Sequence, residues 1–215
     1  EDIILTDVMP FSLGVEIAKR HQNQLESGFF LPLIERNTFL PVSKTETLNT
    51  VEDNQTRVLL KIYQGEGRKV QDNVFLGEMQ VDVPPRPAGE VLLDVRFTYT
   101  LDGLLEVECH HQGSPTVARL VIEKVPGQMS EEQIAESLLR LADLKQHPRD
   151  RPENQALLAR CSRLYERLLG DDRSWLDRGM TAFEQALESQ DLRHIATIRQ
   201  QVEQFLERYE TEEWR

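Results

Sequence analysis

The sequence is poor in cysteine and has no long apolar run. Its two cysteines, Cys109 and Cys161, are too few for a disulfide framework or a thiolate metal site. No stretch approaches the roughly 20 apolar residues that a membrane helix needs. The opening EDIILTDVMP lacks the basic and apolar regions of an export signal, and it lacks an initiator Met. We therefore expect free thiols in a reducing, cytoplasmic compartment, no membrane partner, and a piece of a longer chain.

Positive charge is also scarce. The chain holds 25 Lys and Arg against 37 Asp and Glu, a net charge of −12. Neutralising nucleic-acid phosphates needs clustered Lys and Arg, so this balance argues against a nucleic-acid partner. It mildly favours cationic partners.

Catalytic signatures are absent as well. No phosphate-binding loop, dinucleotide fingerprint or nucleophile elbow occurs. His110 and His111 are the only adjacent histidines, and neighbours on a strand point to opposite faces, which disfavours a shared metal. Glu52-Asp53 and Asp171-Asp172 are more typical of helix caps or solubilising charge than of acid–base catalysis. The sequence predicts that the chain is not an enzyme and has no catalytic residue, metal or cofactor of its own.

The first part of the chain has the pattern of antiparallel β-structure. In VLLDVRFTY, alternate residues from Val91 to Tyr99 are apolar, and LDG at 101–103 supplies a tight turn into LLEVECH. Further runs near 11–18, 29–34, 45–50, 57–64, 75–81 and 116–122 give about eight strands, enough for a β-sandwich, with a barrel as the alternative.

After residue 125 the apolar period changes to that of helices. Ser130 and Gln133 form a capping box at the first helix start. Pro148 and Pro152 predict a kink or break at 147–152. Three amphipathic segments follow, separated by GDD at 170–172 and SQD at 189–191, and should pack as an antiparallel bundle. The expected fold class is α+β, an antiparallel eight-stranded β-sandwich followed by a C-terminal helical lid or bundle.

Several short motifs follow one another in the β-rich part. They read DVMPFSLGVEIA at 7–18, NTFLP at 37–41, VEDNQ at 51–55, QGE at 64–66, DN..LG at 72–77 and DGLLEV at 102–107. Their order and spacing resemble the substrate-binding part of the DnaK-type, seventy-kilodalton heat-shock chaperones. The helical part is similar more loosely, chiefly at GQMSEEQI, and some departures resemble the divergent bacterial HscC type.

This resemblance implies a sandwich of two four-stranded antiparallel sheets whose loops form a channel for an extended peptide, under a helical lid. Its ranges are a linker remnant at 1–10, a peptide-binding subdomain at 11–125 and a lid subdomain at 126–215. The implied channel residues are Val15, Ile17, Ala18, Phe29, Leu48, Val51, Gln55, Val58, Leu60 and Leu93. The implied lid-contact residues are Glu52, Asp53 and Asn54, and the implied linker residues are Ile3, Ile4, Leu5 and Asp7.

The implied function is capture of extended hydrophobic segments of unfolded polypeptides. In the family, ATP and Mg²⁺ bind a preceding nucleotide-binding domain that this chain lacks, and a J-domain co-chaperone acts on the full-length protein. Whether the chain forms a homodimer is left open by the sequence. From periodicity alone the aliphatic channel residues would be assigned to ordinary core rather than to ligand contact, so a structural or adaptor module with helical oligomerisation is the alternative function.

Three segments depart from the family pattern. KRHQNQLESG at 19–28 is longer than the family's first channel loop, and the helical part is shorter than in commoner members. PPRPAG at 84–89 does not align with the loop that carries the latch arginine, which leaves Arg86 a weak candidate for that role.

Overall fold

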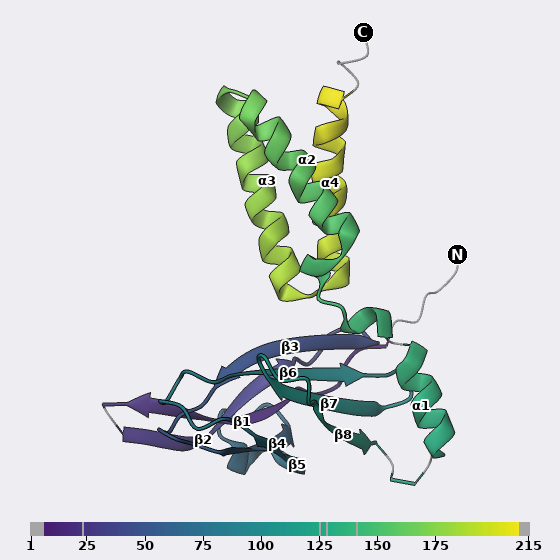
Figure 1. Ribbon diagram of the computed structural model, residues 1–215. Helices are drawn as coiled ribbons and strands as arrows, with labels where there is room; N and C mark the ends of the chain where they lie inside the picture. The colour runs from purple at the N-terminus through teal and green to yellow at the C-terminus, as the bar shows by residue number, and fades with distance from the viewer. Residues whose placement is uncertain (1–6, 23, 125, 128, 141, 211–215) are drawn as a thin grey trace. The chain divides into compact units, whose positions relative to one another are not determined.

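The computed structural model describes residues 7–22, 24–124, 126–127, 129–140 and 142–210. The chain divides into two compact units, Glu1–Lys145 and Gln146–Arg215. Figure 1 shows strands in the first and long helices in the second. No described helix is long and apolar enough to cross a membrane.

The first unit contains eight strands in two four-stranded antiparallel sheets. One sheet has the order β2-β1-β4-β5 and the other β3-β6-β7-β8. The strands are β1 Leu13–His21, β2 Gln24–Ile34, β3 Val42–Asn49, β4 Arg57–Gln64, β5 Val74–Asp82, β6 Leu92–Tyr99, β7 Leu104–His111 and β8 Ala118–Glu123. A 3₁₀ turn, η1 Val70–Asp72, precedes β5. Each strand run expected from the sequence overlaps one of these strands.

The β6–β7 hairpin follows the sequence pattern closely. Val91, Leu93, Val95, Phe97 and Tyr99 are all buried, as the alternation predicts. The turn between Tyr99 and Leu104 contains Gly103 with φ +85°, a backbone conformation that glycine adopts at little cost. The predicted hairpin is confirmed.

One hydrophobic core is shared by both sheets. Leu13, Leu60 and Ile62 come from the first sheet, and Val95 and Phe97 from the second. Because these side chains lie in one cluster, the inner faces of the two sheets face each other. The core therefore fixes how the loops at the ends of the strands are placed.

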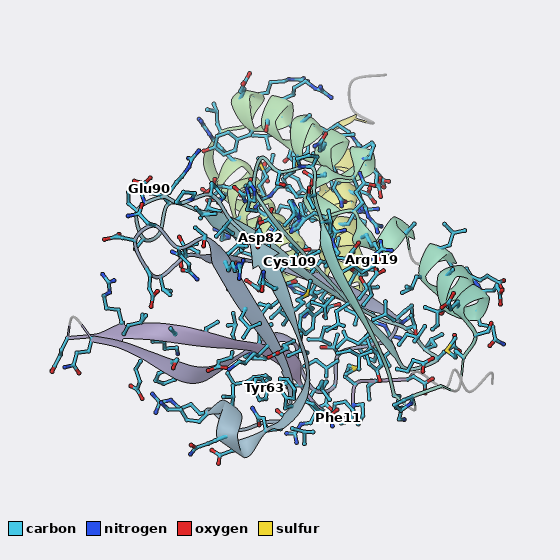
Figure 2. The ribbon with its side chains drawn as sticks, turned by 60° about the horizontal axis from the view of Figure 1, so that its bottom comes forward. Phe11, Tyr63, Asp82, Glu90, Cys109 and Arg119 are labelled. Carbon is cyan, nitrogen blue, oxygen red and sulfur yellow. The ribbon has the colours of Figure 1, made fainter. Side chains whose placement is uncertain are left out.

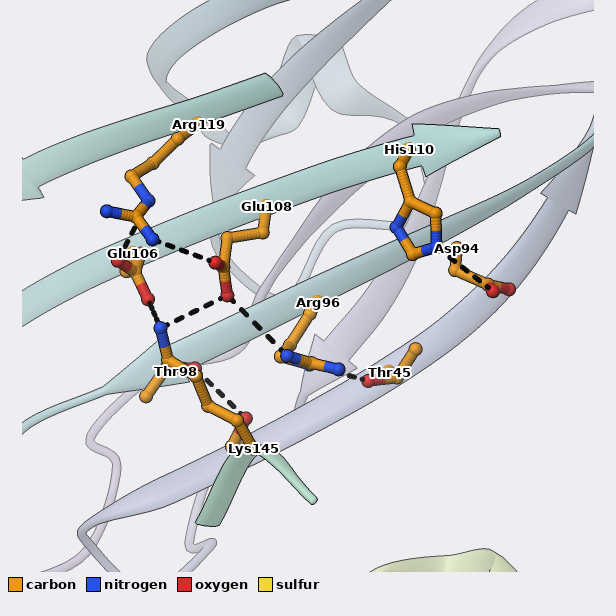
Figure 3. A network of polar contacts seen from close by, with 10 residues as sticks. Thr45, Asp94, Arg96, Thr98, Glu106, Glu108, His110, Arg119 and Lys145 are labelled. Carbon is orange, nitrogen blue, oxygen red and sulfur yellow. Dashed lines mark hydrogen bonds and ion pairs between the residues drawn. The ribbon is translucent and has the colours of Figure 1, made fainter. Parts of the chain in front are cut away.

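Helix α1, Glu131–Arg140, and the 3₁₀ turn η2, Ala142–Lys145, also belong to the first unit. The Ser130 N–H donates to Gln133 Oε1 at 2.9 Å, and the Gln133 N–H donates to Ser130 Oγ at 3.2 Å. These two bonds confirm the predicted capping box. At the other end, Lys145 pairs with Glu106 and Glu108 on the outer face of β7 (Figure 3).

The second unit contains three helices, α2 Pro152–Arg167, α3 Gly170–Ser189 and α4 Leu192–Glu210. Their apolar faces form a separate core that includes Leu157, Leu176, Phe183 and Val202. A short 3₁₀ turn, η3 Pro148–Asp150, precedes α2, so the predicted interruption at 147–152 is confirmed.

The expected fold class, an antiparallel eight-stranded β-sandwich followed by a C-terminal helical lid or bundle, is wrong as stated. The strands form two four-stranded antiparallel sheets that share one core, as the resemblance implied, and not a single closed body of eight strands. The helices form no single lid, because α1 belongs to the first compact unit and α2 to α4 belong to the second. A period of 2 or 3.6 identifies an element but does not reveal the partner against which it packs. The assignment of 1–10, 11–125 and 126–215 to three functional parts stays a prediction.

Candidate binding groove

A gap opens in the first sheet where β1 and β4 separate. The two strands pair only through Leu13–Gln64, Gly14–Tyr63 and Val15–Ile62. Beyond Val15, β1 continues to His21 while pairing with β2 alone. Among the described residues, the edge of β1 that faces β4 therefore has no strand partner from Glu16 onward. An unpaired strand edge presents backbone donors and acceptors to a ligand.

Next to the separation, β1 packs tightly against its other neighbour, β2. A Cβ on Gly14 would lie 2.0 Å from the carbonyl oxygen of Leu31, so β1 and β2 approach too closely for any other residue there. Farther along, the register of β1 and β2 shifts between Ile17 and Lys19, so that Ser27 and Gly28 of β2 together lie opposite Ala18 and form a bulge on β2. A bulge bends its strand and increases the local twist. The bulge thus lies where β1 has left β4.

The gap is a pocket of about 420 Å³, within the usual range for ligand sites. Its walls come from β1, from the end of β3 and the loop after it, and from β4, with β6 and β7 behind. The apolar lining consists of Ile17, Ala18, Leu48, Val51, Val58, Leu59, Leu60, Leu93, Val95 and Cys109. The pocket can therefore accept an apolar side chain. We call it the groove.

Eight of the ten implied channel residues line the groove: Ile17, Ala18, Leu48, Val51, Gln55, Val58, Leu60 and Leu93. The other two do not. Val15 has no exposed surface and lies in the shared core, one residue before the strands separate. Phe29 lies opposite Ile17 on β2 and is 6% exposed. Contact of any of the ten with a peptide stays a prediction.

The loop after β3 is fixed by the loop after β5. The Asn54 N–H donates to the Arg86 carbonyl at 2.9 Å, and the Ala88 N–H donates to Asp53 Oδ1 at 2.8 Å. Asn54 adopts φ +55°, a left-handed conformation that asparagine tolerates. Of the three implied lid-contact residues, Asp53 and Asn54 thus hold the groove wall in place. Glu52 is exposed to solvent, and contact of these residues with a lid stays a prediction.

The side chain of Gln55 forms two further hydrogen bonds within the same loop. Its Oε1 accepts from the Val51 N–H at 3.3 Å, and its Nε2 donates to the Arg57 carbonyl at 2.8 Å. The glutamine side chain therefore bridges the two ends of the turn. Val51 is held at the rim of the groove by this bridge.

Sequence reasoning missed Thr50. It lines the groove and is 3% exposed, and its Oγ1 has no hydrogen-bond partner among the described residues. A buried hydroxyl without a partner costs about 1–3 kcal/mol. A ligand that supplied the missing hydrogen bond would recover that cost. Its place just before VEDNQ was the only sequence signal.

The polar groups around the groove are few and mostly paired. Lys61 Nζ lies 3.4 Å from Glu16 Oε2 on the neighbouring strand. Cys109, labelled in Figure 2, lies at the back of the groove. Burial, with a smaller effect from Asp94, raises the pKa of its thiol to about 12. Cys109 is therefore an uncharged, inert part of the lining.

The implied linker residues do not contribute to the groove. Ile3, Ile4 and Leu5 lie outside the described residues. Asp7 is exposed, and its carbonyl accepts from the Leu40 N–H at 2.9 Å. The linker role of these residues stays a prediction.

A second apolar hollow lies elsewhere in the first unit. Leu76, Leu120, Ile122, Met129 and Ile134 are among the residues that line it, between β5, β8 and the start of α1. It lacks a separated pair of strands, and it is the alternative location for a ligand.

Comparison with known proteins gives a family match. The family described as "Hsp70 protein" matches residues 1–215. The "Chaperone protein DnaK" of Halobacterium salinarum is 38% identical over 137 residues, 63% of this chain and 20% of the relative. The "Heat shock 70 kDa protein" of Ajellomyces capsulatus is 31% identical over 213 residues, 88% of this chain and 29% of the relative. The "Chaperone protein DnaK" of Thermotoga petrophila is 38% identical over 122 residues, 56% of this chain and 19% of the relative. The chain thus spans between about a fifth and a third of the length of these curated relatives.

That match overturns two negative predictions, that the chain is not an enzyme and that it takes no cofactor. The family described as "Hsp70 protein" matches all of residues 1–215, and its relatives are named as chaperones, so the missing motifs do not support either prediction. A missing motif in one stretch of sequence is not evidence against the activity of the protein to which that stretch belongs. Among the described residues, no three His, Cys, Asp or Glu side chains gather as metal ligands, so they present no fitted site for Mg²⁺.

Proposed function

Because this chain belongs to the Hsp70 family, we propose that its groove binds extended apolar segments of unfolded polypeptides, as the substrate-binding part of such a chaperone. The observation that carries the proposal is the separation of β1 from β4 beyond Val15, which leaves a strand edge unpaired beside an apolar pocket. A peptide in extended conformation can occupy both features at once.

The strand edge accounts for affinity without sequence preference. A guest backbone that lies along Glu16–Ala18 would add hydrogen bonds as a further strand does. Each such bond contributes about 0.5–1.5 kcal/mol. These bonds do not depend on the guest's side chains, so binding should tolerate many sequences.

The pocket accounts for the preference for one apolar anchor. Val58, Leu60 and Leu93 lie on its floor, and full burial of a leucine side chain contributes about 1.5–3 kcal/mol. This energy corresponds to roughly 10- to 150-fold in the dissociation constant. Replacing the anchor by serine should forfeit most of that factor.

Binding can be tested with a labelled heptamer that has leucine at its centre, titrated by fluorescence anisotropy. Val58→Phe places a larger side chain in the pocket, and we expect it to weaken binding at least about 10-fold. Val74→Phe is the matched control, because Val74 is 59% exposed on β5 and does not line the groove. Circular dichroism checks that each variant folds.

A second variant keeps the test decisive if Val58→Phe fails to fold. Val51 lies at the rim and is half-buried, so Val51→Asp introduces a charge without overfilling the core. It should weaken binding as well. The proposal is wrong if the wild-type chain does not bind the heptamer, or if both groove variants bind it as tightly as Val74→Phe does. Either result would favour the structural or adaptor module instead.

The whole protein carries further proposals. We propose that ATP hydrolysis and a J-domain co-chaperone regulate this groove in the full-length chaperone, in the cytoplasm. A ligand can shift a conformational equilibrium only by binding its two states differently. The test compares peptide affinity of the full-length protein in ATP and in ADP, where a difference is expected and equal affinities would contradict regulation.

A further inference from the structure

Three cations surround one aromatic ring on the β1–β2 hairpin of this otherwise acidic chain. The nitrogens of Lys19 and Lys69 lie 5.1 and 3.6 Å from the centroid of the Phe29 ring, and the Arg68 guanidinium carbon lies 5.6 Å away. A cation within about 6 Å of an aromatic face is attracted by the ring. We call Lys19, Arg68, Lys69 and Phe29 the arm cluster.

The backbone holds the arm cluster in a fixed place. Phe29 forms an isolated antiparallel bridge with Lys69, and the Phe30 N–H donates to the Arg68 carbonyl at 3.0 Å. These contacts attach the segment before η1 to the outer edge of β2. The hairpin itself is the segment that is longer than in the family, and its additional residues extend β1 to His21 and start β2 at Gln24.

The arm cluster lies next to the groove. Phe29 is the cross-strand partner of Ile17, which lines the groove. Residues that are directly opposite on paired strands present their side chains to the same face. Lys19 follows Ile17 by two residues, and two residues of a strand span about 6.6 Å. A peptide side chain two positions from an anchor in the groove therefore reaches the arm cluster.

The charge of the arm cluster is incompletely balanced. Lys69 pairs with Glu26, which is also the cross-strand neighbour of Lys19, whereas neither Lys19 nor Arg68 forms an ion pair with a carboxylate within the described residues. Three cations within 6 Å of one centroid repel one another, and a guest carboxylate would interact favourably with all of them. In the loop after β3, Glu52 and Asp53 are exposed and acidic.

We propose that the arm cluster makes the groove prefer peptides with an acidic residue two positions from the apolar anchor. The inference rests on the proposed function and refines it, since it names the flanking chemistry of the guest. The net charge of −12 repels acidic peptides at long range, but the Debye length is about 8 Å at physiological salt. Contacts at the arm cluster are shorter than that length, so the local attraction outweighs the screened repulsion.

The test uses three labelled heptamers that share a central leucine. They carry Glu, Ser or Lys at both positions two residues from the leucine, which covers either direction of binding. Exposed ion pairs contribute about 0.2–1 kcal/mol each. With two or three cations in reach, we expect the Glu peptide to bind about 3- to 10-fold more tightly than the Ser peptide in 50 mM salt, and the Lys peptide to bind no better than Ser. In 500 mM salt the difference should shrink.

The double variant Lys19→Gln/Arg68→Gln removes the two cations without a carboxylate partner. It should abolish the preference for Glu and leave affinity for the Ser peptide unchanged. Arg36→Gln/Lys44→Gln is the matched control, because it lowers the net charge equally at positions that do not line the groove. The control should keep the preference.

The outcomes separate the inference from the function on which it rests. If the wild-type chain binds all three peptides equally, or binds the Lys peptide most tightly, the inference is wrong and peptide binding stands. The inference also fails if the arm variant and the control lose the preference to the same extent. If no peptide binds, the proposed function itself fails.

Discussion

Replacing Lys145 by methionine would show how strongly the segment after α1 is fastened to the second sheet. Lys145 pairs with Glu106 and lies 3.2 Å from Glu108 Oε2 (Figure 3). The Glu106 side chain has no exposed surface, and the Glu108 side chain is 13% exposed. Methionine keeps a long, unbranched side chain there but cannot pair with a carboxylate. The substitution therefore removes the charge and keeps most of the packing.

The magnitude follows from what remains around the two carboxylates. Removing one partner from a buried ion pair costs about 3–5 kcal/mol. Arg119 stays 3.3 Å from Glu106, and Arg96 stays 3.7 Å from Glu108, so part of the charge balance survives. Because the Lys145 side chain is itself 17% exposed, water can also enter when the ammonium group is lost. We therefore expect a smaller loss of unfolding free energy, about 2 kcal/mol.

Urea unfolding of the full chain measures this loss. Both tryptophans, Trp175 and Trp214, follow Lys145 in the sequence, where the first unit ends, so their fluorescence does not report on the first unit. The NMR amide intensities of β7 do follow it. With a slope of about 2 kcal/mol per molar urea, the midpoint should fall by about 1 M.

Two further variants control the measurement. Lys61→Met breaks the Glu16 pair, whose side chains are 37% and 19% exposed, and should cost no more than about 1 kcal/mol. Lys145→Arg keeps the charge and should recover part of the loss. If Lys145→Met lowers the midpoint no more than Lys61→Met, the reasoning about this buried network is refuted.

Two other predictions concern the first unit. Burial alone would raise the pKa of Glu108. Its cationic neighbours together lower that pKa by more than burial raises it, so the net pKa lies below the usual value. The stabilisation by the ionised Glu108 is therefore complete above the ordinary glutamate pKa of about 4.3 and is lost as the pH falls through the lower folded pKa. The stability advantage of the wild-type chain over Glu108→Gln should be constant at pH 6–7 and shrink below about pH 4. A difference that is independent of pH would contradict this prediction. Gly14→Ala should cost about 3 kcal/mol or more, because its Cβ would lie 2.0 Å from a backbone oxygen of Leu31. Gly77→Ala, whose Cβ would meet only side-chain atoms, of Leu120 at 3.3 Å and of Ile122 at 3.5 Å, should cost far less in the same thermal melts, and equal losses would speak against a backbone clash.

The strands and their turns were predictable because each depends on neighbouring residues. The alternation from Val91 to Tyr99 and the glycine turn at Gly103 are local signals, and both agree with the structure. The capping box at Ser130 is local in the same sense. The division of the helices between two compact units depends on contacts between distant segments, so the expected fold class needed correction.

The groove shows the same limit residue by residue. Val15 and Ile17 are both aliphatic and lie two positions apart on β1, yet one is sealed in the core and the other lines the groove. The difference arises because β4 leaves β1 after Val15, which no periodicity reveals. Phe29 was implied as a channel residue, whereas the structure places three cations over its ring. The unpartnered hydroxyl of Thr50 is visible only when its surroundings are known.

The most direct test of the account is to locate the bound peptide by NMR. A chain with labelled valine and leucine methyl groups, mixed with the unlabelled leucine heptamer, reports contacts through isotope-filtered nuclear Overhauser effects. If the peptide binds in the groove, we expect contacts from its leucine to the methyl groups of Val58, Leu60 and Leu93. Contacts to Leu76 and Leu120 in the second hollow instead would contradict binding in the groove.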